Sequence, residues 1–302
     1  MTEPSLCIIL NAASGKRGTT GMPERVRAWA ADHGATLLEA GTGGDLPRLC
    51  AQASRGGFST IVAAGGDGTI GAVAETVAGT RARLGVLPMG TFNYFARAHG
   101  IPLDIDAALD VLTGGTDRDV PVAEVNGKLI LNNASLGLYP AILREREAIY
   151  RRWGRSRIAA YWSVLSTVAG FRGSRRMRVT VDGRPSRVKS PMVFVAISAF
   201  QLDRFGLSGA DHVQAGEMAV FVAPDCSRAQ LALFALRLAL RGLRDGRDFD
   251  LLTGREVTIT PSDDRTRPRL VARDGERAAM DPPFRFRVRP EPLRLLVPKD
   301  AG

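Results

Sequence analysis

The chain has 302 residues, of which 45% are hydrophobic and 24% are charged. This composition excludes an intrinsically disordered protein and predicts a folded chain of about two domains. The 41 basic and 31 acidic residues give a net charge of +10, and only 4 of the basic residues are lysines. Such an excess favours an anionic partner, either a nucleic acid or a membrane surface. Because the sequence has no basic signal-peptide segment and no apolar run of transmembrane length, we expect a cytoplasmic protein.

The first third of the chain alternates between strand and helix patterns. Buried apolar strands that alternate with helices predict an α/β domain with a Rossmann-like, open parallel sheet covered by helices on both faces. We assign residues 1–122 to this domain. The expected strands are 6–10, 35–39, 59–64 and 84–87. The expected helices pass through Val26 and Ala30, cover 46–53, follow the turn at 65–68 to about 77, and cover 91–98.

The pattern changes near residue 120, where short strands follow one another without long helices between them. We therefore expect a β-rich second domain over residues 123–302, whose extreme C-terminus is able to return to the first domain. Two helical stretches, around 141–171 and 227–243, interrupt it. The expected strands are 120–125, 129–133, 176–181, 192–198, 218–223, 257–259, 269–272, 284–288 and 293–297.

The strongest local motif is the glycine loop Gly65-Gly66-Asp67-Gly68-Thr69, which lies between an apolar strand and a helix. Glycines allow a sharp turn and a close approach to a ligand, and the N-terminus of the following helix favours phosphate. An aspartate held among these glycines can meet Mg²⁺ or a substrate hydroxyl. The loop therefore predicts a phosphate site with one acidic group, which suffices for phosphoryl transfer.

Two other glycine-containing phosphate motifs are incomplete in this sequence. Gly66, Gly68 and Gly71 satisfy G-x-G-x-x-G, but the dinucleotide fingerprint opens the first βα unit and needs an acid about 20 residues later, which is missing here. Gly15-Lys16 does not complete a Walker A motif. A glycine-rich turn with an aspartate cap remains the structural alternative.

The glycine loop resembles the GGDGT motif of the diacylglycerol kinase catalytic domain and its relatives, the sphingosine, ceramide and NAD kinases and the phosphofructokinases. Three further motifs in the same order strengthen the resemblance. Residues 11–15 resemble the family's Asn-Pro-x-Ser-Gly loop, residues 88–97 resemble its P-x-G-T-x-N-D-x-A-R segment, and residues 274–276 resemble its Asp-Gly-Glu. The resemblance runs from about residue 5 to residue 298.

The resemblance implies an N-terminal α/β nucleotide domain, a C-terminal β-sandwich domain, and a lipid hydroxyl phosphorylated in the cleft between them with ATP and Mg²⁺. Glu276 or Asp274 would take the proton from the hydroxyl, and Asp67 would act at the phosphates through the ATP-bound Mg²⁺. An ordinary Asp-Gly hairpin turn is the alternative for the last motif. The residues implied to bind ATP are Asn11, Ser14, Gly15, Thr42, Gly65, Gly66, Asp67, Gly68, Thr69, Thr91 and Asn93.

Two positions depart from the family pattern. Tyr94 stands where many members carry an aspartate that joins the polar network around the phosphates. Because a phenol cannot replace a carboxylate at a metal, either a subgroup of the family rearranges the site or this protein is a poor kinase. Residues 214–217 read Gln-Ala-Gly-Glu where members with a structural Mg²⁺ carry Asp-Gly. We therefore carry over no structural metal site and expect any Mg²⁺ to arrive with ATP.

Arginines surround both helical stretches of the second domain. Basic amphipathic helices can lie on anionic lipid headgroups, so we expect peripheral contact with the inner face of the membrane; the alternative is that their apolar faces are core. The sequence lacks an RNA-binding aromatic signature and a helix-turn-helix, which argues against nucleic acid, and it says nothing of oligomeric state.

The leading hypothesis is an ATP-dependent lipid kinase similar to bacterial diacylglycerol kinases. The alternatives are a kinase for a sphingoid or ceramide-type lipid, a catalytically weak nucleotide- and lipid-binding homologue, and, more distantly, an NAD kinase.

Overall fold

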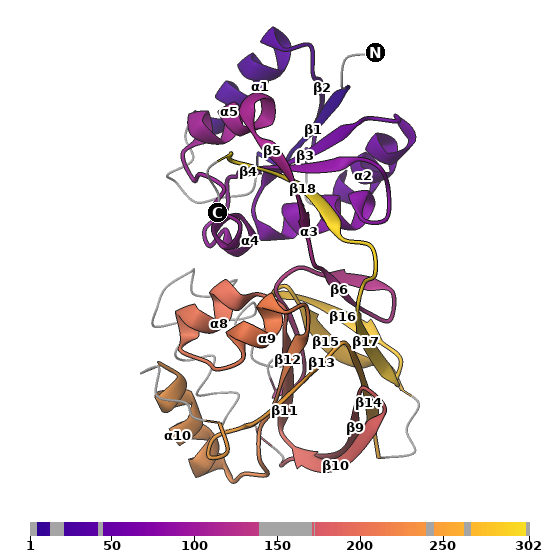
Figure 1. Ribbon diagram of the computed structural model, residues 1–302, viewed down its shortest axis with the longest axis vertical. Helices are drawn as coiled ribbons and strands as arrows, with labels where there is room; N and C mark the ends of the chain where they lie inside the picture. Colours follow the sequence, from indigo (N-terminus) through magenta and orange to yellow (C-terminus); the bar gives the residue numbers. More distant parts are fainter. Residues whose placement is uncertain are drawn as a thin grey trace. The chain divides into compact units, whose positions relative to one another are not determined.

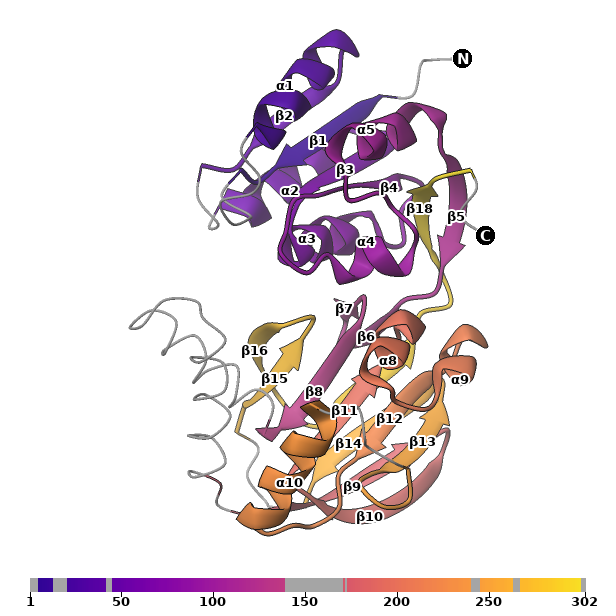
Figure 2. The same cartoon turned by 90° about the vertical axis from the view of Figure 1, so that its left-hand side faces the viewer.

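The computed structural model describes residues 5–12, 21–41, 45–138, 171, 173–239, 245–262 and 267–299. The chain forms two compact domains (Figures 1 and 2). The first contains residues 1–122 together with 289–302, and the second contains residues 123–288. The C-terminal segment 289–302 thus belongs to the α/β domain and not to the β-rich one. No helix in the described ranges is long and apolar enough to cross a membrane.

The first domain is built on a six-stranded sheet in the order β2-β1-β3-β4-β18-β5. The first five strands of this order are parallel, and the edge strand β5 pairs antiparallel to β18. This is the predicted open parallel sheet, with one antiparallel strand added. Its strands are β1 (Leu6–Leu10), β2 (Thr36–Glu39), β3 (Thr60–Gly65), β4 (Arg83–Pro88), β5 (Thr116–Val120) and β18 (Leu293–Val297).

Helices cover both faces of this sheet, as Figure 2 shows. Alternating residues of β1 and β3, such as Ile8 and Val62, pack against α1 and α5 in one apolar cluster. The other face is covered by α2 and α3, whose Ile70 and Val73 are fully buried. The helices are α1 (Met22–Asp32), α2 (Leu46–Arg55), α3 (Asp67–Val77), α4 (Tyr94–Ala98) and α5 (Ile105–Gly114).

The second domain contains two antiparallel six-stranded sheets, which we call the second sheet (β10-β9-β14-β17-β6-β7) and the third sheet (β13-β12-β11-β8-β15-β16). The second sheet is formed by β10 (Arg184–Ser190), β9 (Arg175–Val181), β14 (Glu256–Pro261), β17 (Phe284–Val288), β6 (Ala123–Val125) and β7 (Lys128–Ile130). The third sheet is formed by β13 (Asp250–Gly254), β12 (Met218–Val222), β11 (Met192–Ala196), β8 (Asn133–Gly137), β15 (Arg269–Arg273) and β16 (Glu276–Met280).

The two sheets form the expected β-sandwich. Its core joins side chains of the second sheet, among them Val179 and Phe286, to side chains of the third, among them Val195 and Val220. Strand alternation gives each sheet one apolar inner face and one outer face. The outer face of the third sheet is covered by α8 (Ala199–Phe205), α9 (Ala210–Gln214) and α10 (Arg228–Ala239).

Several predicted elements differ from the observed ones. The expected helix over 91–98 begins only at Tyr94, because Asn93 adopts a left-handed conformation with φ 50°. The expected strand 120–125 is broken between β5 and β6, and 129–133 is divided between β7 and β8. Strand 293–297 is β18 and pairs with β4 and β5 in the first domain. The predicted helical stretch 141–171 lies outside the described residues except for Phe171.

Candidate active site

The glycine loop follows β3 and leads directly into α3. Gly65 ends the strand, Gly66 precedes the helix with an extended backbone (φ −88°, ψ −178°), and Asp67 is the first helical residue. The first amide groups of a helix have no partner within it, and together with the positive end of the helix dipole they bind anions. This position, at the carboxyl end of a parallel strand, is where α/β sheets bind phosphorylated ligands.

Close packing explains the glycines of this loop better than a dinucleotide fingerprint does. A Cβ on Gly65 would lie 2.5 Å from Oγ1 of Thr69, so a larger residue cannot be accommodated without movement. A Cβ on Gly71 would meet nothing within 4 Å. The third glycine of the dinucleotide motif exists to bring helix and strand close together. Gly71 has no such function here, which agrees with the exclusion of that motif.

The segment between β4 and α4 packs against the glycine loop. The backbone N–H of Met89 donates to the carbonyl oxygen of Gly65 at 2.8 Å. Asn93, buried and left-handed, closes the segment on itself: its Oδ1 accepts from the N–H of Gly90 at 2.9 Å and its Nδ2 donates to the Gly90 carbonyl at 3.0 Å. Gly90 lies so close that an added Cβ would be 2.6 Å from Cα of Gly66. The two glycine-containing segments therefore form one rigid loop cluster.

Asp67 links these two segments. Its Oδ1 accepts the backbone N–H of Phe95 at 3.4 Å, at the start of α4. Burial raises the pKa of the Asp67 carboxyl above its usual value, while backbone N–H groups of residues 93–95 oppose that rise. Thr91, which is exposed, lies on the same segment. Asp67 thus lies against the segment that carries Thr91 and Asn93, and the assignment of all three to an ATP site stays a prediction.

Asn11, which follows β1, also contacts the glycine loop. Nδ2 of Asn11 donates to Oγ1 of Thr69 at 3.1 Å, and its backbone N–H bonds the carbonyl of Ala64 at 2.9 Å. The Oδ1 atom of Asn11 is buried and has no hydrogen-bond partner among the described residues. A buried acceptor without a partner is unfavourable, so Asn11 fits a ligand that donates a hydrogen bond. Ser14, Gly15 and Thr42 lie outside the described residues.

The Asp-Gly-Glu motif forms the tight turn between β15 and β16 in the second domain. Asp274 is left-handed (φ 48°), and its carboxylate accepts three backbone N–H groups: that of Leu131 at 2.9 Å on Oδ2, and those of Asn132 and Asn133 at 2.7 and 3.1 Å on Oδ1. Burial raises the pKa of this carboxyl and the three N–H groups lower it. Asp274 therefore holds the 131–133 backbone against the turn.

Glu276 differs sharply from Asp274 although it lies two residues away. It begins β16 and is exposed, and its side chain makes no hydrogen bond or ion pair with any residue in the described part of the chain. Its carboxylate is therefore available to a ligand, whereas that of Asp274 is already used. The two acids that the sequence grouped as alternative bases thus have different environments.

The structure adds polar residues that the sequence reasoning missed. Nδ2 of Asn133 donates to Oε1 of Gln201 at 2.7 Å in a buried pair next to the Asp274 turn. The neighbouring Asn132 is only 4% exposed, and its Oδ1 has no partner among the described residues. The adjacent asparagines were the available signal, since two amides in an apolar strand must find partners, but the sequence did not show that Gln201 faces them.

Both departures from the family pattern have a local structure. Tyr94 begins α4, and its ring stacks on that of Phe92, with centroids 5.6 Å apart and planes 9° from parallel. In residues 214–217, α9 ends at Gln214, and Glu217 pairs with Nδ1 of His212 at 3.0 Å. Within the described ranges, no group of three or more His, Cys, Asp or Glu side chains is arranged to hold a metal ion.

The second predicted membrane-contacting helix corresponds to α10. Its Leu231 is buried, and Phe234 packs against the apolar cluster beneath the third sheet. Arg237 pairs with the buried carboxylate of Asp248 at 2.5 Å. Leu233 is 44% exposed. Leu231 and Phe234 therefore pack within the domain, which favours the interpretation that the apolar face of this helix is core. Contact of the helix with a membrane stays a prediction.

Comparison with protein families finds a match for each half of the chain. Residues 5–125 match the model described as the diacylglycerol kinase catalytic domain, and residues 141–297 match that of the YegS C-terminal NAD kinase beta sandwich-like domain. The two matched segments together cover most of the chain and contain all four motifs.

Individual relatives are similar over a shorter region. A Pseudomonas aeruginosa protein named "Probable lipid kinase YegS-like" is 51% identical over 96 residues, 31% of this chain and 32% of that protein. A Cronobacter sakazakii protein of the same name is 41% identical over 98 residues, 31% of this chain and 33% of that protein. The crystal structure of a diacylglycerol kinase from Bacillus anthracis str. Sterne superposes with a TM-score of 0.71 at 20% identity and covers 98% of each chain, which shows a common fold.

Proposed function

Since the chain belongs to the diacylglycerol kinase catalytic-domain family, with a YegS-type C-terminal domain, we propose that this kinase transfers the γ-phosphoryl group of ATP to the hydroxyl of a lipid alcohol such as diacylglycerol. The observation that carries the proposal is Asp67 at the N-terminus of α3, fixed between two closely packed glycine segments. Phosphoryl transfer depends mainly on positioning and charge neutralisation, and this cluster offers both.

In this proposal the first amide groups of α3, from Asp67 to Thr69, bind the phosphates of ATP. The unpartnered Oδ1 of Asn11 accepts a hydrogen bond from an amino or hydroxyl group of the nucleotide. Asn93 keeps the Gly90 segment against the glycine loop, so that the phosphates meet a preformed surface. The nucleotide site also includes, because of their positions in the family motifs, Ser14, Gly15 and Thr42.

Asp67 is the residue that we propose faces the Mg²⁺ carried by ATP, which would neutralise charge on the transferring phosphoryl group. A carboxylate has about four acceptor positions, so the amides at the start of α4 leave some of them for a cation. The loop cluster fits this group, because its glycines permit close approach and its single acid is held rigidly.

On the acceptor side, Glu276 is proposed as the base that takes the proton from the lipid hydroxyl, because its carboxylate is exposed and has no partner among the described residues. Asp274 is proposed as a positioning residue, because three backbone N–H groups already occupy its oxygens. A general base must be free to reach the proton it removes, and only Glu276 meets that condition.

Tyr94 motivates a second candidate function, a catalytically weak protein that binds nucleotide and lipid. Its ring stacks on Phe92, and a phenol supplies no carboxylate to the phosphate network. A sphingoid or ceramide-type lipid is the alternative acceptor. For each of these we propose action at the inner face of the cytoplasmic membrane, where a lipid alcohol is presented at the surface.

The proposal is tested by incubating purified protein with labelled ATP, Mg²⁺ and a panel of lipid alcohols in mixed micelles. Wild-type protein should phosphorylate at least one lipid, and Asp67→Asn and Glu276→Gln should each remove the activity. Glu291→Gln, an identical change at another exposed glutamate, is the matched control and should be fully active. ATP binding without transfer to any lipid would overturn the kinase proposal, and a large gain in turnover by Tyr94→Asp would support the weak-enzyme alternative.

A further inference from the structure

The outer face of the second sheet carries a group of arginines. Strand alternation directs Met177 and Val179 of β9 into the sandwich core, so the intervening residues point outward. Strands β10 and β17 alternate in the same way, since Phe284 and Phe286 are buried on either side of exposed Arg285. We call the outward and exposed side chains Arg176, Arg178, Arg187 and Arg285 the cationic face.

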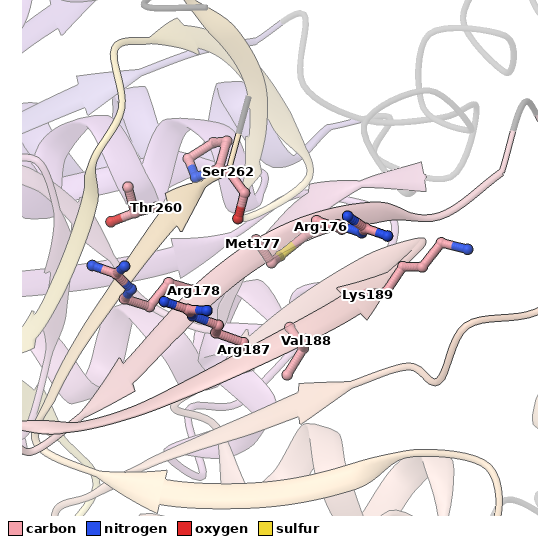
Figure 3. Close-up of a pocket in the computed structure, with 9 residues that line it drawn as sticks. Arg176, Met177, Arg178, Arg187, Val188, Lys189, Thr260 and Ser262 are labelled. Atoms are coloured by element: carbon pink, nitrogen blue, oxygen red, sulfur yellow. The ribbon is translucent and has the colours of Figure 1, made fainter. Parts of the chain in front are cut away.

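The strand register places like charges directly opposite one another. Arg178 of β9 is paired with Arg187 of β10, and Arg176 is paired with Lys189. Figure 3 shows the guanidinium groups of Arg178 and Arg187 on the same side of the hairpin. Like charges at directly opposed positions destabilise a sheet. Because Lys189 has its own acidic partner, it is the Arg178–Arg187 pair that is unfavourable unless an anion lies over it.

Neighbouring cations have acidic partners, and the cationic face does not. Lys189 pairs with Asp225 at 2.7 Å, and Arg287 of β17 pairs with Glu124 at 2.7 Å. Arg178 and the other three residues of the cationic face form no ion pair with any side chain in the ranges that the structure describes. The positive charge of this face is thus left for a partner outside the described chain.

The surface between these strands is hollowed. A shallow depression of about 600 Å³ is lined by Arg176, Arg178 and Arg187, together with the hydroxyl-bearing Thr260 and Ser262 at the end of β14. Arginine donates two parallel hydrogen bonds to phosphate oxygens, and a hydroxyl adds a further donor. Phosphate is the anion that this combination of donors fits best.

We propose that the cationic face docks the protein on the phosphate headgroups of an anionic membrane. This inference rests on the proposed function, which places the substrate in a membrane. The large hydrophobic side chains that are exposed in the described chain, Phe92, Leu233 and Leu270, belong to other elements. Without exposed aromatic side chains the face offers no stacking to nucleic-acid bases. Met177, Val188 and Pro261 also line the depression but are not among the exposed large hydrophobic residues, so the face binds through its arginines at the headgroup level.

The test is cosedimentation with vesicles of phosphatidylcholine containing roughly a third phosphatidylglycerol, with pure phosphatidylcholine vesicles for comparison. Arg178→Gln/Arg187→Gln removes two charges from the cationic face. The matched control Arg55→Gln/Arg81→Gln removes two exposed charges at the end of α2 and before β4. A basic residue near an anionic surface contributes about fivefold to binding, so the first variant should bind roughly 10–30-fold more weakly, and the control should retain wild-type binding. Raising NaCl from about 0.1 M to about 0.5 M should release the wild type.

Equal loss in both variants, or no loss in either, would overturn the inference, as would tighter binding to a single-stranded RNA oligomer or to inorganic phosphate than to the vesicles. Lipid phosphorylation in neutral detergent micelles is measured in parallel. Activity there should be unchanged in Arg178→Gln/Arg187→Gln, because the micelle carries no charge. A wild type that binds anionic vesicles through this face but phosphorylates no lipid would refute the proposed function alone.

Discussion

Gly90 offers the sharpest test of the loop cluster at the candidate site. In Gly90→Ala the new methyl would lie 2.6 Å from Cα of Gly66 and 2.7 Å from Oδ1 of Asn93. The first of these is backbone and cannot rotate away. Ordinary contact begins at 3.4 Å, so the Gly66 and Gly90 segments must separate by roughly 0.8–1 Å.

Both stability and activity should respond. An extra methyl in a packed region costs about 1–3 kcal/mol, which for a chain of this size corresponds to a fall in Tm of a few degrees. A displacement of ~1 Å in groups that position substrate costs about 100-fold in rate, and Asp67 adjoins Gly66. We therefore expect kcat/KM for ATP to fall by roughly two orders of magnitude, far more than the loss of stability alone predicts.

The matched control is Gly71→Ala, four residues beyond Asp67 in α3. A Cβ there meets nothing within 4 Å, and alanine stabilises a helix interior by about 0.5–1 kcal/mol relative to glycine. Thermal denaturation and labelled-ATP transfer assays on both variants make the comparison. Wild-type Tm and kcat/KM in Gly90→Ala would refute the proposed rigid contact between the two segments.

The other predictions concern titratable groups. Asp274→Asn should lower the free energy of unfolding by roughly 2–3 kcal/mol because an amide nitrogen would face backbone N–H donors, whereas Glu276→Gln should leave Tm unchanged; equal Tm values would contradict the division of roles. Burial and then Arg118 lower the pKa of His99 to about 4. As the pH falls, the unfolded chain binds a proton at His99 before the folded chain does. The free energy of unfolding should therefore fall by roughly 3 kcal/mol between about pH 6.5 and about pH 4. Denaturant titrations of His99→Gln should show that this pH dependence is lost. Asp248→Asn should lower the free energy of unfolding by about 2 kcal/mol in chemical denaturation, because Arg237 and Arg247 both lose their buried carboxylate partner. Unchanged stability would show that water replaces the carboxylate at the two guanidinium groups.

The sequence was most informative where one local pattern determined one element. The strand-loop-helix around Gly65 was predicted because a short apolar run, glycines and a helical pattern follow one another directly. Strand β10 was missed because its residues 184–190 are almost all exposed, so no apolar alternation marks them. Strand β16 was missed for the same reason, since its side chains are only partly buried.

Tertiary contacts explain the remaining differences at the candidate site. The two hydrogen bonds between Asn93 and Gly90 determine where α4 begins. The intrinsic helix propensities of the residues do not reflect such a contact. The motif Asp-Gly-Glu indicated two nearby acids, but their roles depend on whether 131–133 donates to one of them, and those residues are about 140 positions away in the chain. A local motif can name a pair of acids and cannot distinguish them.

Strand β18 has a consequence for the synthesis of the protein. The α/β domain is completed by residues 293–297, which insert between β4 and β5, and the chain leaves and re-enters this domain at adjacent points, where the N–H of Arg289 donates to the carbonyl of Val122 at 2.8 Å. A nascent chain on the ribosome therefore holds an unfinished sheet with an open edge at β4 until residues 293–297 emerge. The domain that we propose binds ATP closes only after the β-sandwich between its two segments has been synthesised, so chains terminated before residue 293 should be unable to use the nucleotide.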